Sequence, residues 1–170
     1  DERIATATKD RLYLTTFSTN TGAYANAYEL EVTVYDNKPV LVSGGSGEAT
    51  GTPSSFARII DEKPQDVYGG NSIAGIQDRT LNKIEYDVDN IVTLSNDKEF
   101  TLQKGTYVID FSAPAYIALN TNAWLWSVTD NKKVLQGSTE YGNNATGMST
   151  THSKGRYTVT LTEAHTYKIQ

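Results

Sequence analysis

Apolar and polar residues alternate with a period of two along much of this chain. The clearest case is residues 28–35, where one face of the pattern is apolar and the other polar. The apolar face carries Tyr28, Leu30, Val32 and Val34, and the polar face carries Glu29, Glu31 and Thr33. Residues 106–111 and 156–161 repeat the pattern, with Tyr107, Ile109 and Phe111 on one face of the first and Tyr157, Val159 and Leu161 on one face of the second. Because successive side chains of a strand point to opposite faces, the alternation predicts half-buried β-strands.

Short extended segments follow one another at regular spacing from residue 79 onward. We predict strands at 79–85, 90–95, 99–102, 105–112, 122–129, 133–138, 149–153, 156–161 and 165–169. Earlier strands are predicted at 4–8, 11–17, 28–35, 40–43 and 56–60. Gly, Asn and Asp residues separate them and supply tight turns. The pattern is typical of an all-β antiparallel sandwich or barrel.

Residues 43–55 form the segment richest in Gly, Ser and Thr. Such a composition suits a linker between domains or a long loop within one domain. We favour a loop or short linker. The predicted organisation is therefore a β-rich N-terminal segment or connecting subdomain at 1–55, followed by a sandwich at 56–170.

The predicted strand at 122–128 departs from the alternation because both of its faces are apolar. Ala123, Leu125 and Ser127 lie on one face, and Trp124, Trp126 and Val128 lie on the other. A strand that is apolar on both sides must be covered on both sides. Leaving the two indoles exposed would forfeit roughly 1.5–3 kcal/mol of burial free energy each. We therefore expect another chain, the N-terminal segment or a ligand to cover the second face. The first of these predicts oligomerisation through Trp124, Trp126 and Val128.

Composition excludes several classes of protein. The chain has 170 residues, no cysteine, a net charge of −5 and 11 tyrosines. Without cysteine it has neither a disulfide framework nor a thiolate metal site. Its scattered Lys and Arg residues argue against a nucleic-acid groove, and no apolar run approaches the ~20 residues of a membrane-spanning helix. Abundant Tyr and Thr suit pleated, half-buried surfaces.

Candidate catalytic and metal-binding groups are few. The two histidines, His152 and His165, could be combined with Ser149 or Ser153, but no G-x-S-x-G elbow accompanies them. A two-histidine metal site would require the histidines to be cross-strand neighbours with a carboxylate. The alternating oxygens of residues 87–90 are better explained by a turn than by a cation loop, because the Gly and the distal Glu of such a loop are missing. We predict no catalytic residue, no metal and no cofactor.

Polar loops with aromatic residues are the remaining candidates for binding. Tyr141, Asn143 and Asn144 follow one another closely, and residues 69–76 form a second loop of similar composition. Adaptable binding surfaces use the same residue types. Tyr141 would stack on a sugar ring while the two asparagines hydrogen-bond its hydroxyl groups. The alternative is an ordinary solvated turn.

Several sequence blocks occur in an order that resembles a known family. They are R-T-L-N (79–82), I-V-T-L-S (91–95), F-T-L-Q-K-G-T-Y-V-I (100–109), S-A-P-A-Y (112–116), N-A-W-L-W-S-V-T-D (122–130), V-L-Q-G-S-T-E (134–140) and G-R-Y-T-V (155–159). Together they resemble the trimeric knob domains at the ends of bacteriophage tail or head fibres. Those knobs are jelly rolls related in shape to tumour necrosis factor and to the globular heads of complement. The resemblance does not include residues 1–55.

The resemblance implies a non-enzymatic homotrimer at the virion surface that contacts other fibre proteins and attaches to a glycan or protein of the host cell. The alternatives are a purely structural fibre or decoration protein and a bacterial surface adhesin that uses a phage-derived knob. Neither nucleic acid nor membrane insertion is expected. Related knobs continue beyond the strand matching residues 166–170, so we expect a later strand, a segment of residues 1–55 or a partner to complete the sheet.

Overall fold

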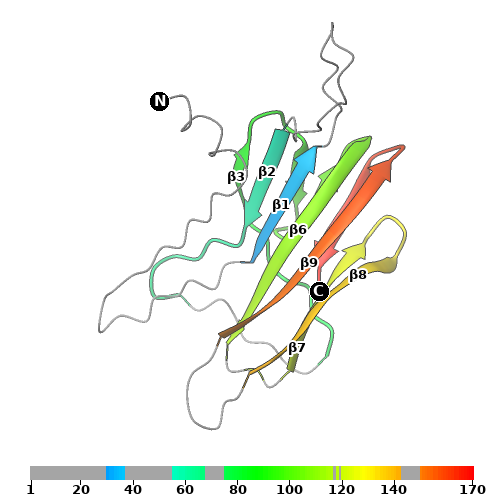
Figure 1. The fold of residues 1–170 in the computed structure, drawn as a ribbon. Coiled ribbons are helices and arrows are strands. Elements are labelled where there is room, and N and C mark those ends of the chain that lie inside the picture. The colour runs from blue at the N-terminus through cyan, green and yellow to red at the C-terminus, as the bar shows by residue number, and fades with distance from the viewer. Residues whose placement is uncertain (1–29, 37–54, 68–74, 117, 119, 143–149) are drawn as a thin grey trace, which may run out of the picture.

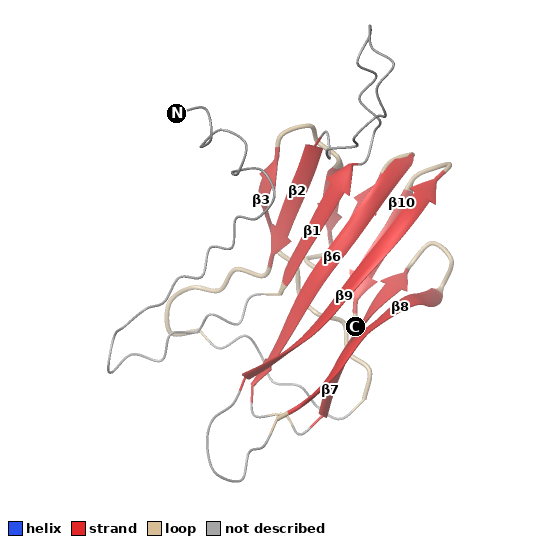
Figure 2. Ribbon diagram, in the orientation of Figure 1, coloured by secondary structure: helices blue, strands red, loops and turns tan. Residues whose placement is uncertain are grey.

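The computed structural model describes residues 30–36, 55–67, 75–116, 118, 120–142 and 150–170. These residues form ten β-strands, and no helix occurs among them (Figure 2). A helix long and apolar enough to cross a membrane is accordingly not found in these ranges. The predictions at 4–8, 11–17 and 40–43, and the Gly-rich loop, lie outside the described residues.

Two five-stranded antiparallel sheets pack face to face (Figure 1). The first sheet, in the order β3-β2-β1-β6-β9, contains β3 (Lys83–Asp87), β2 (Ser55–Ile60), β1 (Glu31–Asp36), β6 (Gly105–Tyr116) and β9 (Thr150–Leu161). The second, in the order β4-β5-β10-β7-β8, contains β4 (Val92–Ser95), β5 (Glu99–Leu102), β10 (His165–Ile169), β7 (Asn120–Ser127) and β8 (Lys132–Tyr141). From β5 onward the chain passes repeatedly between the sheets. The predicted all-β jelly-roll sandwich is confirmed.

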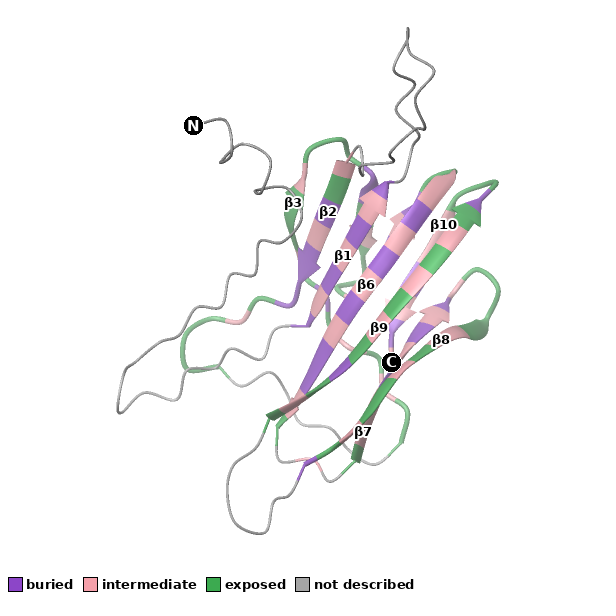
Figure 3. Cartoon of the chain, viewed as in Figure 1, coloured by how far each residue is buried: buried purple, intermediate pink, exposed green. Residues whose placement is uncertain are grey.

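The core lies between the two sheets and is built from the alternation seen in the sequence (Figure 3). Val32 and Val34 of β1 are fully buried, as predicted for their face. In β6 the buried residues are Tyr107, Ile109 and Phe111, again one face of the predicted pattern. The largest buried side chains of the second sheet, Phe100 and Tyr167, face this core with ring centroids 5.8 Å apart.

A segment from the first third of the chain completes the first sheet. β1 lies between β2 and β6 and pairs with both along all six of its residues; Val34, for example, is opposite Ala57 on one side and Ile109 on the other. Residues 31–36 therefore belong to the sandwich. Which segment takes the place of the strand expected after residue 170 stays a prediction. Whether the rest of residues 1–55 forms a subdomain stays a prediction.

One predicted break between strands is wrong. The segments at 149–153 and 156–161 are a single strand, β9, which pairs with β6 without interruption from Thr150 to Leu161. The sequence suggested a turn at Gly155, but this glycine lies directly beneath the Phe111 ring. A Cβ atom placed on Gly155 would be 2.5 Å from two atoms of that ring. The glycine thus makes room for a cross-strand aromatic side chain instead of turning the chain.

The predicted strand at 79–85 also begins later, at Lys83. Two of the preceding residues bond to the second sheet. The Arg79 amide donates to the carbonyl of Ile169 at 2.8 Å, and the Leu81 amide donates to the carbonyl of Asp97 at 2.8 Å. The chain then joins the first sheet at Asn82, whose amide donates to the carbonyl of Ile60 in β2 at 3.0 Å.

Candidate binding surfaces

β7 has the two faces that the sequence predicted, but the outer one is partly covered within the chain. Ala123, Leu125 and Ser127 are buried in the core. Trp124, Trp126 and Val128 lie on the opposite face and are half-buried. The ammonium group of Lys133, on the adjacent strand β8, lies 4.3 Å from the ring centroid of Trp124, a cation–π contact. The alkyl chain of Lys133 therefore covers part of this face. Participation of these three residues in a trimer contact stays a prediction.

A more exposed aromatic cluster lies on the outer face of the first sheet. Tyr35 of β1, Phe56 of β2 and Tyr86 of β3 form a row across three neighbouring strands, called here the aromatic ladder. The ring centroids of Tyr35 and Phe56 are 6.4 Å apart, and those of Phe56 and Tyr86 are 4.4 Å apart. Phe56 is 39% exposed and Tyr86 is 43% exposed.

Sequence reasoning missed the aromatic ladder. Each of its residues occupies a solvent-facing position of its own strand, and a single exposed aromatic residue is unremarkable. Only strand pairing brings them together: Tyr35 is opposite Phe56 in the β1–β2 register. The sequence signal for the ladder was Tyr35, an aromatic residue on the polar face of residues 28–35.

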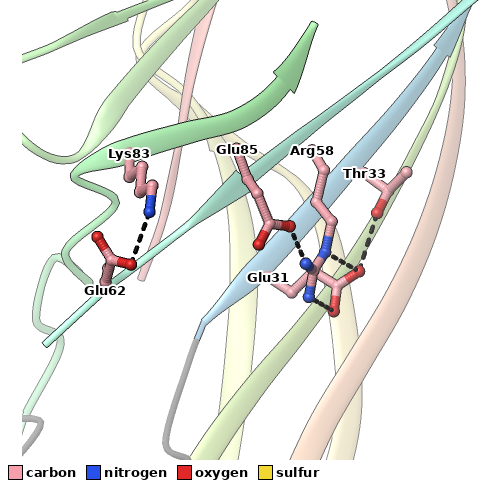
Figure 4. A network of polar contacts seen from close by, with 6 residues as sticks. All are labelled: Glu31, Thr33, Arg58, Glu62, Lys83 and Glu85. Atoms are coloured by element: carbon pink, nitrogen blue, oxygen red, sulfur yellow. Dashed lines mark hydrogen bonds and ion pairs between the residues drawn. The ribbon is translucent and has the colours of Figure 1, made fainter. Parts of the chain in front are cut away.

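An ion-pair network joins β1, β2 and β3, the strands that carry the aromatic ladder (Figure 4). The Arg58 guanidinium contacts Glu31 through Nε at 3.1 Å and Nη2 at 3.2 Å, and it also pairs with Glu85. The hydrogen bond to Glu31 is the main reason why the pKa of Arg58 is raised above its ordinary value. Lys83 donates to Glu62 at 2.6 Å. Each charge in this network is thus paired within its own chain.

A second ion pair continues this arrangement across the sheet. Arg156 of β9 binds Asp110 of β6 with two parallel bonds, 2.6 Å from Nε and 2.7 Å from Nη2. Bidentate geometry of this kind is the strongest form of the Arg–carboxylate contact. The outer face of the first sheet therefore combines exposed aromatic rings with internally neutralised charge.

A cavity of about 420 Å³ lies at the end of the sandwich where β6 ends and β7 begins. This size is within the range of small-ligand sites. Its wall includes Arg79, Ala113, Ala115, Asn120, Asn122 and Trp124. Tyr141, 67% exposed, is paired with Asn120 and so lies at the same end. Of the predicted receptor-loop residues, Tyr141 is thus exposed near a cavity, whereas Asn143 and Asn144 lie outside the described residues.

Asp78 attaches the segment before β3 to the second sheet. Its carboxylate accepts a bond from Lys168 at 2.7 Å and from Gln170 at 2.9 Å, and it lies 3.3 Å from Lys98. Burial alone would raise the pKa of Asp78, but these hydrogen bonds and charges lower it to about 2.

Ser127, His165 and Asp130 meet at the opposite end of the sandwich, a combination that sequence reasoning did not select. Ser127 Oγ lies 2.8 Å from His165 Nε2, and Asp130 Oδ2 lies 3.3 Å from the same nitrogen. A catalytic triad needs the carboxylate on the other ring nitrogen, and Ser127 is fully buried. The cluster therefore has the geometry of a structural contact, in which Ser127 Oγ also accepts a bond from the Asp130 amide at 2.9 Å.

The other candidates for chemistry also have structural partners. The Ser153 hydroxyl donates to the Ser138 carbonyl and accepts from the Ala123 amide, so it joins β9 to the second sheet. Ser149 lies outside the described residues. His152 is in the first sheet and His165 in the second, so they are not cross-strand neighbours.

The acidic turn at 87–90 has the structure of a turn, the interpretation that we favoured. Both carboxylate oxygens of Asp87 accept backbone bonds, from Ile91 at 2.9 Å and from Val92 at 3.0 Å. Asn90 has a φ of 52°, a left-handed conformation that asparagine tolerates. Among the described residues no group of three or more metal-ligating side chains comes together.

Comparison with family models, with curated proteins and with solved structures finds no match for this chain.

Proposed function

We propose that this protein is a non-enzymatic attachment module that self-associates, as a homotrimer, on the surface of a virion fibre. In this proposal it contacts other fibre proteins and binds a glycan or protein on the host cell. The sandwich fold and the exposed aromatic ladder support the proposal, together with the resemblance of the sequence blocks to phage fibre knobs. The likeness to tumour necrosis factor belongs to the same proposal.

The aromatic ladder is the observation that carries self-association. Three rings in contact across β1, β2 and β3 form a contiguous apolar surface on the outer face of the sheet. Contiguous exposed apolar surface of this kind marks sites of protein contact. Aromatic residues are also those enriched at the centres of protein interfaces.

A second copy of the chain is the occupant that fits this surface best. In a symmetric assembly equivalent surfaces come close together around the axis, so unpaired like charges would repel. Here Arg58 is neutralised by Glu31 and Glu85, and Arg156 by Asp110. The contact between copies therefore brings together aromatic surface without an excess of one charge.

A trimer would place side by side the three sandwich ends that contain the cavity. Three weak sites on one rigid body bind a cell surface more tightly than one site, because the second and third contacts are intramolecular. Attachment to the cell then results from avidity, and no covalent bond is made or broken.

The test is sedimentation equilibrium of the pure protein, followed by binding of the labelled protein to a glycan array and to bacterial cells. We expect a mass three times that of the chain, 18.6 kDa, and retention on at least one surface. A monomer at all accessible concentrations would overturn the assembly. A trimer that binds none of these surfaces would favour the purely structural fibre protein.

A further inference from the structure

We propose that an extended segment of a partner protein, with alternating apolar side chains and one basic side chain, adds to the free edge of β9 in a cavity between β8 and β9. This inference deepens the proposed function, on which it rests, by naming the chemistry of the contact with other fibre proteins. Three observations carry it: a strand edge without a neighbouring strand among the described residues, a cavity beside that edge, and a carboxylate in the cavity wall without a cationic partner in the described part of the chain.

β8 and β9 are edge strands of the two sheets, and they meet where β9 begins. There the Ser153 hydroxyl donates to the Ser138 carbonyl at 2.6 Å, and the Lys154 amide donates to Ser138 Oγ at 3.0 Å. Toward the end of β9 the two strands diverge (Figure 1). A second cavity, of about 320 Å³ and called here the seam cavity, has residues of β8, β9 and β10 in its wall. β8 therefore covers the edge of β9 near its beginning and leaves it open near its end.

The open part of the β9 edge presents backbone hydrogen-bonding groups. Lys154 shows their direction, because its amide points away from β6 and toward β8, and alternate residues of a strand direct their backbone groups to the same side. The backbone groups of Thr158 and Thr160 therefore also point away from β6, and Thr160 is part of the cavity wall. Among the described residues no strand pairs with β9 on that side. A free edge of this kind is a template for pairing with another extended chain.

The inner face of β9 carries apolar side chains that the sandwich covers only in part. Tyr157 and Val159 pack against the core but remain half-buried, as does Val134 of β8. All three side chains belong to residues that line the seam cavity. In an added strand every second side chain would lie on this inner face, where apolar groups gain burial free energy. The cavity therefore favours an extended segment with apolar residues at alternate positions.

Glu163 gives the site a preference for positive charge. It lines the seam cavity in the turn between β9 and β10, and among the described residues no cationic group lies at ion-pair distance from it. The other carboxylate of the wall, Asp130, already lies 3.3 Å from Lys132 Nζ and 3.3 Å from His165 Nε2. A basic side chain of the added segment would therefore pair with Glu163, whereas an acidic one would be repelled.

A single extended segment fits this place better than a second copy of the sandwich. Ser138 of β8 bonds to Ser153 and Lys154, so β8 flanks the β9 edge directly beside its open part. A lone strand can enter between β8 and β9. Pairing of the β9 edges of two sandwiches would also have to accommodate both flanking β8 strands. The occupant is therefore a segment without a sheet of its own.

The test uses the peptide acetyl-Lys-Thr-Val-Thr-Val-amide as a probe. Every strand pairing in the two sheets is antiparallel. In the same orientation the probe places its threonines opposite Thr160 and Thr158, its valines on the inner face and its lysine near Glu163. We expect the amide resonances of Thr158 and Thr160 in isotope-labelled protein to shift saturably with the probe. Both amides should also exchange more slowly with solvent, because the probe backbone accepts their hydrogen bonds.

Two altered probes separate the backbone and charge contributions. N-methylation of both probe threonines removes the donors that face β9 and should weaken binding about tenfold. Replacing the probe lysine with glutamine should weaken binding about threefold, as expected for the loss of a solvent-exposed ion pair. Glu163→Gln should remove this difference between the lysine and glutamine probes. Glu140→Gln, a matched change near the other end of β8, should preserve it.

The inference would be overturned if the probe caused no saturable shift at Thr158 and Thr160, or if the methylated probe bound equally well. Equal affinities of the lysine and glutamine probes would overturn the preference for a basic segment. Slow exchange of both amides in the assembled protein without a probe would show that a second copy occupies the edge, and it would overturn the inference as well. Sedimentation of the same samples separates the two proposals: a trimer that does not bind the probe overturns only the partner segment, and a monomer that binds it overturns only the assembly.

Discussion

Phe56 and Tyr86 stack on the solvent side of the first sheet, with ring centroids 4.4 Å apart and ring planes inclined by 13°. Both rings remain more than one-third exposed despite the contact. The pair joins β2 to the edge strand β3 and forms the most exposed part of the aromatic ladder. A stacked aromatic pair stabilises the sheet by about 0.5–1.5 kcal/mol beyond burial, but it leaves apolar surface for a partner.

Replacing Phe56 with Ser should weaken self-association much more than stability. We expect a shift from trimer toward monomer equivalent to at least a tenfold rise in the dissociation constant, measured by sedimentation equilibrium. Stability should fall by about 1 kcal/mol, because the ring contacts of Phe56 with Tyr86 and Tyr35 lie on the exposed face of the sheet. The matched control is Val88→Ser, which removes an apolar side chain that is 64% exposed in the β3–β4 turn, outside the aromatic ladder. Equal association of both variants would contradict an interface on the ladder.

Asp78→Asn should destabilise the fold by about 1 kcal/mol, because Lys98 and Lys168 lose the carboxylate that they share. Urea unfolding at pH 7 measures this loss. Asp89→Asn, at an exposed turn position, is the matched control and should have little effect. If both variants unfolded at the same urea concentration, the Asp78 cluster would not contribute to stability.

Asp78 also predicts a specific response to acid. Its folded pKa is about 2, against an ordinary value of 3.8. The folded state thus binds this proton more weakly than the unfolded state, and the contribution of Asp78 is fully present above 3.8 and is lost as the pH falls toward 2. The difference in stability between the native protein and Asp78→Asn should therefore shrink across that interval. A difference that stayed constant from pH 5 to pH 2 would contradict the assignment.

His152 should titrate below its ordinary pKa of 6.5, mainly because of burial and secondarily because of Lys154, while Glu140 partly opposes the shift. The unfolded chain then binds the proton more readily than the folded chain. The free energy of unfolding should therefore rise with pH between the lowered folded-state pKa and 6.5. Below the folded-state pKa the imidazole is protonated in both states, and this contribution of neutral His152 to stability is absent. An NMR titration of the imidazole measures the pKa directly. Lys154→Gln should move it upward, and a pKa at or above 6.5 in the native protein would contradict the prediction.

Gly155→Ala should destabilise the protein by about 1–3 kcal/mol, because the new methyl group would overlap the Phe111 ring and approach Leu135 within 2.9 Å. Thermal unfolding measures the loss. Thr158→Ala, at an exposed position of the same strand, controls for the general effect of alanine in β9. A variant as stable as the native protein would show that β9 does not pass closely beneath Phe111.

The inner faces of the strands could be predicted because burial alternates with strand periodicity. Val32 and Val34 are buried as the pattern indicates, and so are Tyr107, Ile109 and Phe111. For β7 the pattern did not indicate which of its two apolar faces is the inner one. Its composition indicated an apolar surface, but the position of Lys133 over Trp124 depends on how β7 and β8 pair.

The candidate sites required contacts between residues distant in sequence. Tyr35, Phe56 and Tyr86 form one surface only because β1, β2 and β3 are neighbours. Arg79 and Trp124 line the same cavity, and the Arg79 amide bonds to Ile169 of β10, the strand beside β7. The close approach of Gly155 to the Phe111 ring likewise joins residues distant in sequence.

The sequence by itself determined the all-β class, the apolar inner faces and the turn at Asp87, because these depend on interactions within a few residues. The tertiary structure decided the order of the strands, the central position of β1, the aromatic ladder and the cavity. The reason is physical: alternation specifies which face of a strand is buried, but it carries no information about which other strand will pair with it. That choice is made by the summed packing and hydrogen bonding of the whole sandwich.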